Sequence, residues 1–92
     1  MIPEIQSIIT QIEKSDADLG TIKLYAFGSA TLPNTKPEDI DILVSYDRPE
    51  QAKVIRKLLE SLLYMNLDLI FMTTEEENET DFIRSQKCIP IY

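Results

Sequence analysis

The chain has 92 residues, of which 43% are hydrophobic, and a net charge of −7. This length predicts a single domain over residues 1–92 with a modest hydrophobic core. The acidic balance argues against a long nucleic acid as partner, because such a partner needs Lys and Arg on its phosphates. The chain has no histidine, which excludes histidine acid–base chemistry, histidine metal sites and Ser-His-Asp triads.

The composition also predicts the cellular compartment. The single cysteine, Cys88, excludes an internal disulfide and fits a reducing compartment. No stretch approaches the roughly 18 apolar residues of a membrane span. The N-terminus lacks the basic region and apolar block of a signal peptide. We therefore expect a cytoplasmic protein with no membrane partner.

The first half of the chain predicts a helix and two strands. Residues 21–27 and 40–46 are rich in aliphatic and aromatic side chains and predict two strands. The connection between them contains Pro33 and Pro37 and is short, so we expect the two strands to be antiparallel neighbours. Before them, residues 3–14 carry isoleucines at the spacing of one helix face: Ile5, Ile8, Ile9 and Ile12.

The second half predicts further helices and strands. Asp47 is the expected cap of a helix that carries an apolar stripe. A third strand is predicted at residues 67–72, followed by a polar loop and first helical turn at residues 73–79. We expect a short helix at residues 80–86, and we expect residues 88–92 either to add an edge strand or to pack on the core. The stripe of the long helix consists of Ile55, Leu58, Leu59, Leu62 and Leu63.

Two carboxylates begin the second predicted strand. Because side chains in a strand alternate between faces, Asp39 and Asp41 point the same way. Two carboxylates so close together repel each other, and a divalent metal such as Mg²⁺ suits their hard oxygens. At the end of the preceding strand, Gly28 lets backbone N–H groups approach a phosphate, and Ser29 adds a hydroxyl donor. A phosphate cradle beside paired carboxylates is what metal-assisted phosphoryl or nucleotidyl transfer requires.

Asp68 is a lone carboxylate within the apolar third strand. One interpretation places it at the exposed start of that strand, without a function. We favour the other, a third metal ligand beside Asp39 and Asp41, because the expected strand order could bring Asp68 alongside them and a carboxylate is rarely buried without a partner. The basic cluster Lys53, Arg56 and Lys57 is left with two interpretations as well. It is either a solvated helix face or a contact for phosphate or an acidic partner.

The pattern of Gly28-Ser29, nine further residues and then Asp39-Ile40-Asp41 resembles the nucleotidyltransferase superfamily that includes DNA polymerase β. The small size, the lone Asp68 and the C-terminal segment that ends Ile89-Pro90-Ile91-Tyr92 resemble its minimal nucleotidyltransferase (MNT, MntA-like) branch. The resemblance covers nearly the whole chain. It implies an α/β (α+β-like) fold, with a small mixed β-sheet flanked by helices.

The resemblance also implies a mechanism. Asp39 and Asp41 bind two Mg²⁺ ions, and Asp68 helps to hold the ion that activates an acceptor hydroxyl. Gly28 and Ser29 hold the β- and γ-phosphates of the nucleotide. The hydroxyl then attacks the α-phosphate in line and pyrophosphate leaves.

Members of this branch are commonly antitoxins of type VII toxin–antitoxin pairs. The resemblance implies transfer of AMP from ATP to a tyrosine of a HEPN-type toxin, in an assembly with that partner. Many relatives carry an arginine soon after the Gly-Ser pair, whereas this chain has no basic residue between Ser29 and Lys36. The alternative hypothesis is therefore a binding module that neutralises its partner by occlusion. A third hypothesis is a structural domain without a ligand.

Overall fold

The computed structural model describes residues 3–15, 19–32 and 39–92, so the prolines of the loop after Ser29 lie outside the described residues. No helix within these ranges is long and apolar enough to cross a bilayer. The described elements, in chain order, are α1 (Pro3–Glu13), β1 (Lys23–Phe27), the 3-10 helix η1 (Gly28–Thr31), β2 (Ile40–Tyr46), α2 (Pro49–Leu59), the 3-10 helix η2 (Glu60–Met65), β3 (Leu67–Thr73), α3 (Thr74–Thr80), α4 (Phe82–Ser85) and β4 (Ile89–Pro90).

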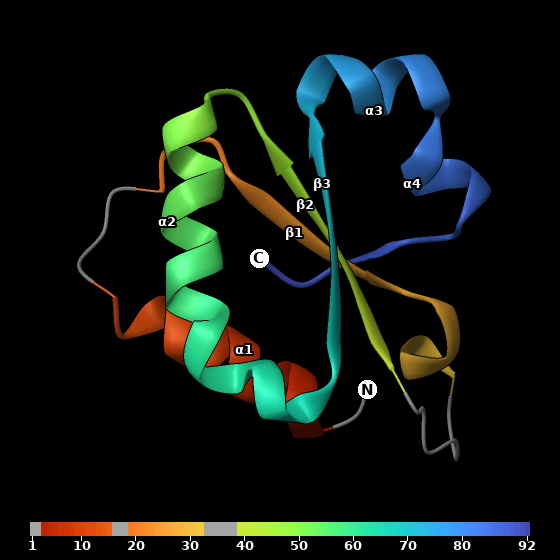
Figure 1. The fold of residues 1–92 in the computed structure, drawn as a ribbon. Helices are drawn as coiled ribbons and strands as arrows, with labels where there is room; N and C mark the ends of the chain where they lie inside the picture. Colours follow the sequence, from red (N-terminus) through yellow and green to blue (C-terminus); the bar gives the residue numbers. More distant parts are fainter. Residues whose placement is uncertain (1–2, 16–18, 33–38) are drawn as a thin grey trace.

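The described strands form one mixed sheet in the order β3-β2-β1-β4. β1 pairs antiparallel with β2, as the short connection predicts, and antiparallel with β4. β2 and β3 pair in parallel, because α2 carries the chain back across the sheet between them. Figure 1 views the sheet from its β3 edge, with β1 and β4 behind. The mixed sheet flanked by helices confirms the α+β fold expected from the sequence.

The main core lies between α1, α2 and one face of the sheet. Alternate residues of the central strand, Ile40, Ile42 and Val44, are buried there together with Leu24 and Ala26 of β1. The helices contribute the isoleucines and leucines of their predicted apolar faces. These are Ile5, Ile8 and Ile12 of α1 and Ile55 and Leu59 of α2.

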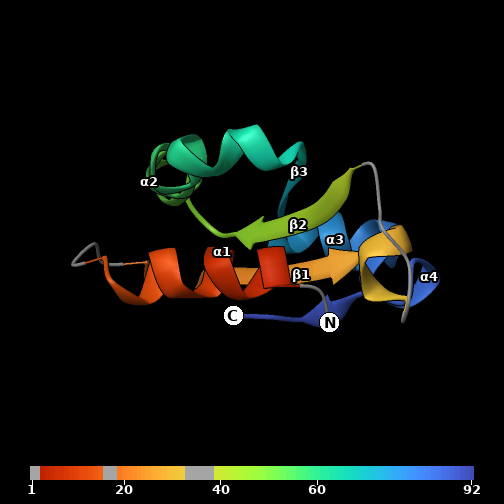
Figure 2. The ribbon, with the colours of Figure 1, turned by 90° about the horizontal axis from the view of Figure 1, so that it is seen from below.

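The opposite face of the sheet carries the odd-numbered residues of β2. Leu43 is fully buried on this face, and α3 and α4 lie over it. The rings of Phe27 and Phe82 pack edge to face, with their centroids 5.2 Å apart, and so join α4 to the end of β1. Figure 2 shows the strands from β3 to β4, with α1 on one side of them and α3 and α4 on the other.

The start of α2 differs from the prediction. Arg48 precedes the first helical residue, and the carboxylate of Asp47 accepts hydrogen bonds from the hydroxyls of Thr21 and Thr74 instead of capping the helix. These two bonds hold the pKa of Asp47 below its usual value. Asp47 thus ties the loop before β1 to the start of α3, which is a structural role that the sequence pattern did not indicate.

Two other boundaries differ from the prediction. The helix expected to extend through Leu63 ends at Leu59 and continues as the 3-10 segment η2. The polar stretch after β3 is a complete helix, α3, and not a loop with a first turn. Thr73 and Glu76 form a capping box there, in which each side chain accepts the other's backbone N–H. This reciprocal capping explains why a segment without an apolar stripe is helical.

Candidate functional site

The structure places two predicted site residues directly opposite each other. Asp41 is the second residue of β2, and its partner in the parallel register with β3 is Asp68. On the other side of β2, Asp41 is paired with Phe27, the last residue of β1. The residue that follows Phe27 is Gly28, so the Gly-Ser bend and both aspartates meet at one end of the sheet.

Gly28 lies against the carboxylate of Asp41. A Cβ atom added at this glycine would come within 2.5 Å of Oδ2 of Asp41, which is too close for any real side chain. The backbone at Gly28 has a φ of +72°, which L side chains rarely adopt. A side chain at this position would therefore be strained by the backbone conformation and would have to displace the end of the Asp41 side chain.

The electrostatics of Asp41 follow from these neighbours. Its side chain is half-buried, and burial is the largest cause of a raised pKa. The charge of Asp68 is the next cause, followed by the charge of Asp39 and a hydrogen bond with the side chain of Asp68. Within the described residues, every cause that acts on the pKa of Asp41 raises it, and none of them is a positive group.

Asp39 and Ser29 lie at the margin of this pair. Asp39 is exposed in the bend that precedes β2 and acts on Asp41 through its charge. Ser29 is exposed in η1, at the end of β1. In the described part of the chain, no three acidic or cysteine side chains are gathered closely enough to hold a metal ion. The structure thus brings Asp41 and Asp68 into contact and leaves Asp39 near them but outside that contact.

The donor atoms at this end of the sheet fit a hard divalent cation. They are carboxylate oxygens, which Mg²⁺ prefers. A cation beside Asp41 and Asp68 would remove the repulsion that raises the pKa of Asp41. Asp68 is itself exposed, so the pair can be reached from solvent.

Thr31 is a further residue of the site that the sequence pattern did not identify. Its hydroxyl donates a hydrogen bond of 2.8 Å to the backbone carbonyl of Gly28, three residues earlier. This bond closes the single turn of η1 and fixes the backbone next to Asp41. Threonine hydroxyls can bond to backbone carbonyls three or four residues earlier, and this local pattern could have indicated the role.

A hollow of about 380 Å³ opens at the other end of the same sheet face, between β1, β2 and α3. Tyr25 of β1, Ser45 of β2 and Glu77 of α3 are among the residues that line it. Ser45 comes four positions after Asp41 in β2, which corresponds to about 13 Å along a strand. This hollow is therefore distinct from the carboxylate pair.

Residues 6–89 match the family model described as a nucleotidyltransferase domain. The chain belongs to the nucleotidyltransferase domain family. The match spans Gly28, Ser29 and all three predicted aspartates, and it supports nucleotidyl transfer as the general activity. Nucleotidyltransferases generally use a nucleoside triphosphate and a divalent metal. Among curated proteins and among solved structures, no chain matches this one significantly.

Proposed function

We propose that this nucleotidyltransferase is a Mg²⁺-dependent, MntA-like antitoxin that transfers AMP from ATP to a tyrosine hydroxyl of a HEPN-type toxin. Family membership supports the general reaction. The observation that carries the site assignment is the contact between Asp41 and Asp68 beside a glycine that has no room for a side chain. The partner and the acceptor come from the resemblance to the minimal branch.

The proposed roles follow the positions of the residues. Gly28 and Ser29 bind the β- and γ-phosphates, since a bend at the end of a strand exposes backbone N–H groups and the Ser29 hydroxyl. Asp41 and Asp68 would hold Mg²⁺, and the charge of Asp39 would act on the ion from outside their contact. When bound, Mg²⁺ supplies neutralisation of phosphate charge and lowers the pKa of a bound hydroxyl.

The reaction is a displacement at phosphorus. The tyrosine oxygen forms a bond to the α-phosphorus, and the bond from that phosphorus to the bridging oxygen of the β-phosphate breaks, which releases pyrophosphate. We assign acceptance of the hydroxyl proton to the carboxylate of Asp68, because it is the exposed member of the pair. Since this chemistry needs oriented carboxylates and a metal, the absence of histidine is no obstacle.

Labelled ATP tests the proposal. The purified protein, Mg²⁺, ATP labelled at the α-phosphate and the product of the neighbouring gene are incubated together. We expect label on a tyrosine of the partner and an equal amount of pyrophosphate. Asp41→Asn should abolish both, whereas Glu79→Gln, which removes an exposed charge from α3, should retain them. A stable complex that transfers no label would contradict the proposed catalysis.

Two observations favour a second function, neutralisation of the partner by occlusion. Asp39 lies outside the contact between Asp41 and Asp68, and no basic residue follows Ser29 before Lys36. Asp41→Asn separates the two functions in a growth assay with the partner expressed. If occlusion suffices, the variant still forms the complex and still neutralises the partner. If transfer is required, the complex forms and growth is lost.

A further inference from the structure

The outer edge of the sheet at β3 is open within the described part of the chain. β3 has seven residues and pairs only with β2 there. Six of these residues are half-buried, and the remaining one, Asp68, is exposed and is the strand's only charge. Most proteins protect an edge strand with charges, bulges or short length. A long strand with half-exposed apolar side chains on both faces is instead suited to pair with another strand.

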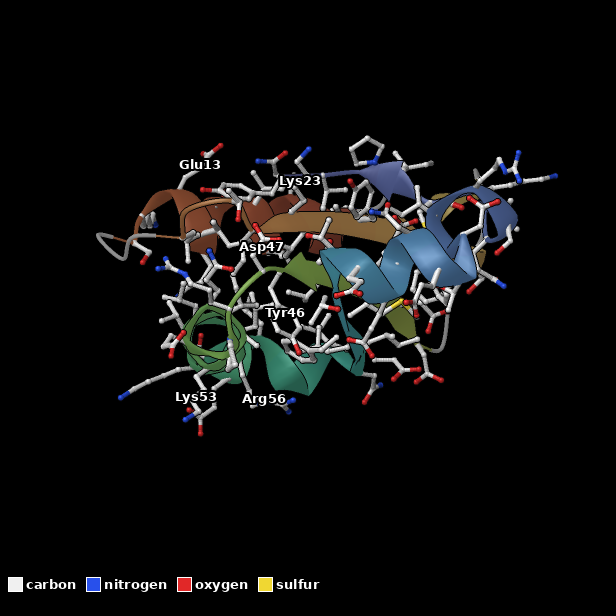
Figure 3. The ribbon with its side chains drawn as sticks, turned by 90° about the horizontal axis from the view of Figure 1, so that it is seen from above. Glu13, Lys23, Tyr46, Asp47, Lys53 and Arg56 are labelled. Carbon is white, nitrogen blue, oxygen red and sulfur yellow. The ribbon has the colours of Figure 1, made fainter. Side chains whose placement is uncertain are left out.

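Beside this edge, α2 and β3 enclose a hollow of about 550 Å³. It is lined by Leu69 of β3 and by the charged side chains of α2 and η2, namely Lys53, Arg56, Lys57 and Glu60. Figure 3 shows Lys53 and Arg56 on the side of the molecule away from Lys23. Three of the chain's nine basic residues thus gather here, although the net charge of the chain is −7.

Contacts with the sheet hold one of these cations in place. The guanidinium carbon of Arg56 lies 4.5 Å from the ring centroid of Phe71, and Tyr46 packs against the same ring at 6.5 Å. Lys53 and Lys57 are exposed, and neither forms an ion pair within the described residues. The hollow therefore has one fixed positive group and two lysines that are available to a ligand.

We propose that the β3 edge and this hollow form a docking surface for an extended acidic segment of another protein, which binds as an additional strand. The unpaired backbone groups of β3 would bond to the added strand, and its alternate side chains would meet Leu69 and the lysines. Charge complementarity indicates which kind of partner binds to this surface. A second copy of this chain or a nucleic acid would bring a strongly negative molecule against an acidic protein. The side chains of a short acidic segment would meet three cations and one carboxylate, that of Glu60, in the hollow. The inference does not depend on the proposed catalysis.

Peptide binding tests the surface. The probes are two fluorescent peptides of about eight residues, one alternating threonine with glutamate and one alternating threonine with lysine. Fluorescence anisotropy should show binding of the glutamate peptide only, and the binding should weaken as NaCl rises. The double variant Lys53→Glu/Lys57→Glu should weaken it about tenfold or more. Lys14→Glu/Lys23→Glu reverses two exposed charges elsewhere and serves as the matched control.

Amide hydrogen exchange locates the bound peptide. The proposal expects new protection of alternate amides in β3 on addition of the glutamate peptide, and none in β4. Four outcomes would overturn it: no binding of the glutamate peptide, equal binding of the lysine peptide, equal loss in both double variants, or protection outside β3. Protection of β3 in the chain alone, rising with protein concentration alongside dimer formation in sedimentation, would assign the edge to a second copy instead.

Discussion

Gly28 is the residue at which backbone conformation and the carboxylate pair depend on each other. We predict that Gly28→Ala lowers the free energy of unfolding by about 1–3 kcal/mol, because the positive φ strains any other residue. The added methyl must also displace Oδ2 of Asp41. Urea denaturation measures the loss of stability, and titration with ATP and Mg²⁺ measures the loss of binding.

Gly20→Ala is the matched control for this prediction. Gly20 has a φ of +56°, and an added Cβ would meet the side chain of Gln51, far from the carboxylates. We therefore expect a loss of stability at this position with nucleotide binding retained. Equal binding by the two alanine variants would show that the close approach of Gly28 to Asp41 has no part in the site.

Asp41 should destabilise the protein when no metal is bound. We predict that Asp41→Asn raises the Tm by about 2 °C or more in metal-free buffer at neutral pH, because it removes a partly buried charge and the repulsion of that charge by Asp68 and Asp39. The pKa of Asp41 is raised in the folded state, so folding favours its protonated form. Ionised Asp41 therefore lowers the free energy of unfolding by the full amount above the folded-state pKa. This loss disappears as the pH falls below the pKa of about 4 that an aspartate has in the unfolded chain.

Thermal melts of both proteins across this pH range check the sign. The advantage of Asp41→Asn over the wild type should shrink as the pH falls and vanish in acid. Asp39→Asn should give a smaller gain, because the charge of Asp39 affects Asp41 less than that of Asp68 does. A neutral-pH Tm below that of the wild type for Asp41→Asn would contradict the prediction.

Local patterns were sufficient for part of the site. Alternation along a strand predicted Asp39 and Asp41 on one side of the second strand, but only Asp41 lies in β2, whereas Asp39 lies in the bend before it. The Gly28-Ser29 pair follows the end of β1 as expected. The contact between Asp41 and Asp68 could only be a hypothesis at the level of sequence. It depends on the parallel register of two strands that α2 separates, and no local pattern fixes that register.

Among the elements, α2 is anchored at its start by one buried amide. Oε1 of Gln51 accepts hydrogen bonds from the backbone N–H groups of Asp47 and Arg48, and its Nε2 donates to the carbonyl of Leu19. We predict that Gln51→Ala lowers the free energy of unfolding by about 2 kcal/mol, because buried partners lose their bonds. Urea denaturation followed by circular dichroism measures this loss.

Two further variants help to interpret the loss of stability expected for Gln51→Ala. Gln51→Glu keeps the acceptor oxygens but loses the donor to Leu19, so it should also destabilise the protein at neutral pH. Gln6→Ala changes an exposed glutamine of α1 and should alter stability by about 0.5 kcal/mol or less. If Gln51→Ala behaved like Gln6→Ala, the amide would not anchor the helix.

The elements with regular apolar patterns were the ones that the sequence predicted well. β2 has the predicted bounds, and α1 differs from its prediction by one residue at its end. The sequence Thr-Glu-Glu-Glu-Asn-Glu-Thr of α3 has no apolar periodicity, so its helix depends on the Thr73–Glu76 capping box and could not be recognised by that criterion. Asp47 was misassigned because its two threonine partners are 26 and 27 residues away in the sequence.

At the scale of the whole molecule, ligand binding should appear as stability. We predict that Mg²⁺ and ATP together, at about 100 times the dissociation constant, stabilise the fold by about 2.7 kcal/mol. For a chain of this length this corresponds to a rise in Tm of about 11–22 °C. A thermal-shift titration measures it, since a ligand that binds only the folded state must raise the melting temperature.

The same titration on Asp41→Asn provides the control. We expect the variant to start from a higher metal-free Tm and to gain little from Mg²⁺ and ATP, so that the two melting curves cross as ligand is added. A wild-type protein whose Tm does not respond to Mg²⁺ and ATP would support a domain without a nucleotide site.

The fold family was evident from the sequence motif, whereas the open β3 edge became visible only once the strand order was known.

The pairing of Asp41 with Asp68 has a consequence for when a newly synthesised chain can first form the candidate site. Gly28 and Asp41 belong to one half of the candidate site, which is contained in the hairpin of β1 and β2. Asp68, the carboxylate opposite Asp41, is 27 positions later in the sequence and comes into register only after α2 has folded back over the sheet. A ribosome-bound chain that ends before β3 can therefore form the hairpin but cannot present the acidic pair. We expect the acidic pair of the candidate site to form late in synthesis, when most of the polypeptide has already emerged.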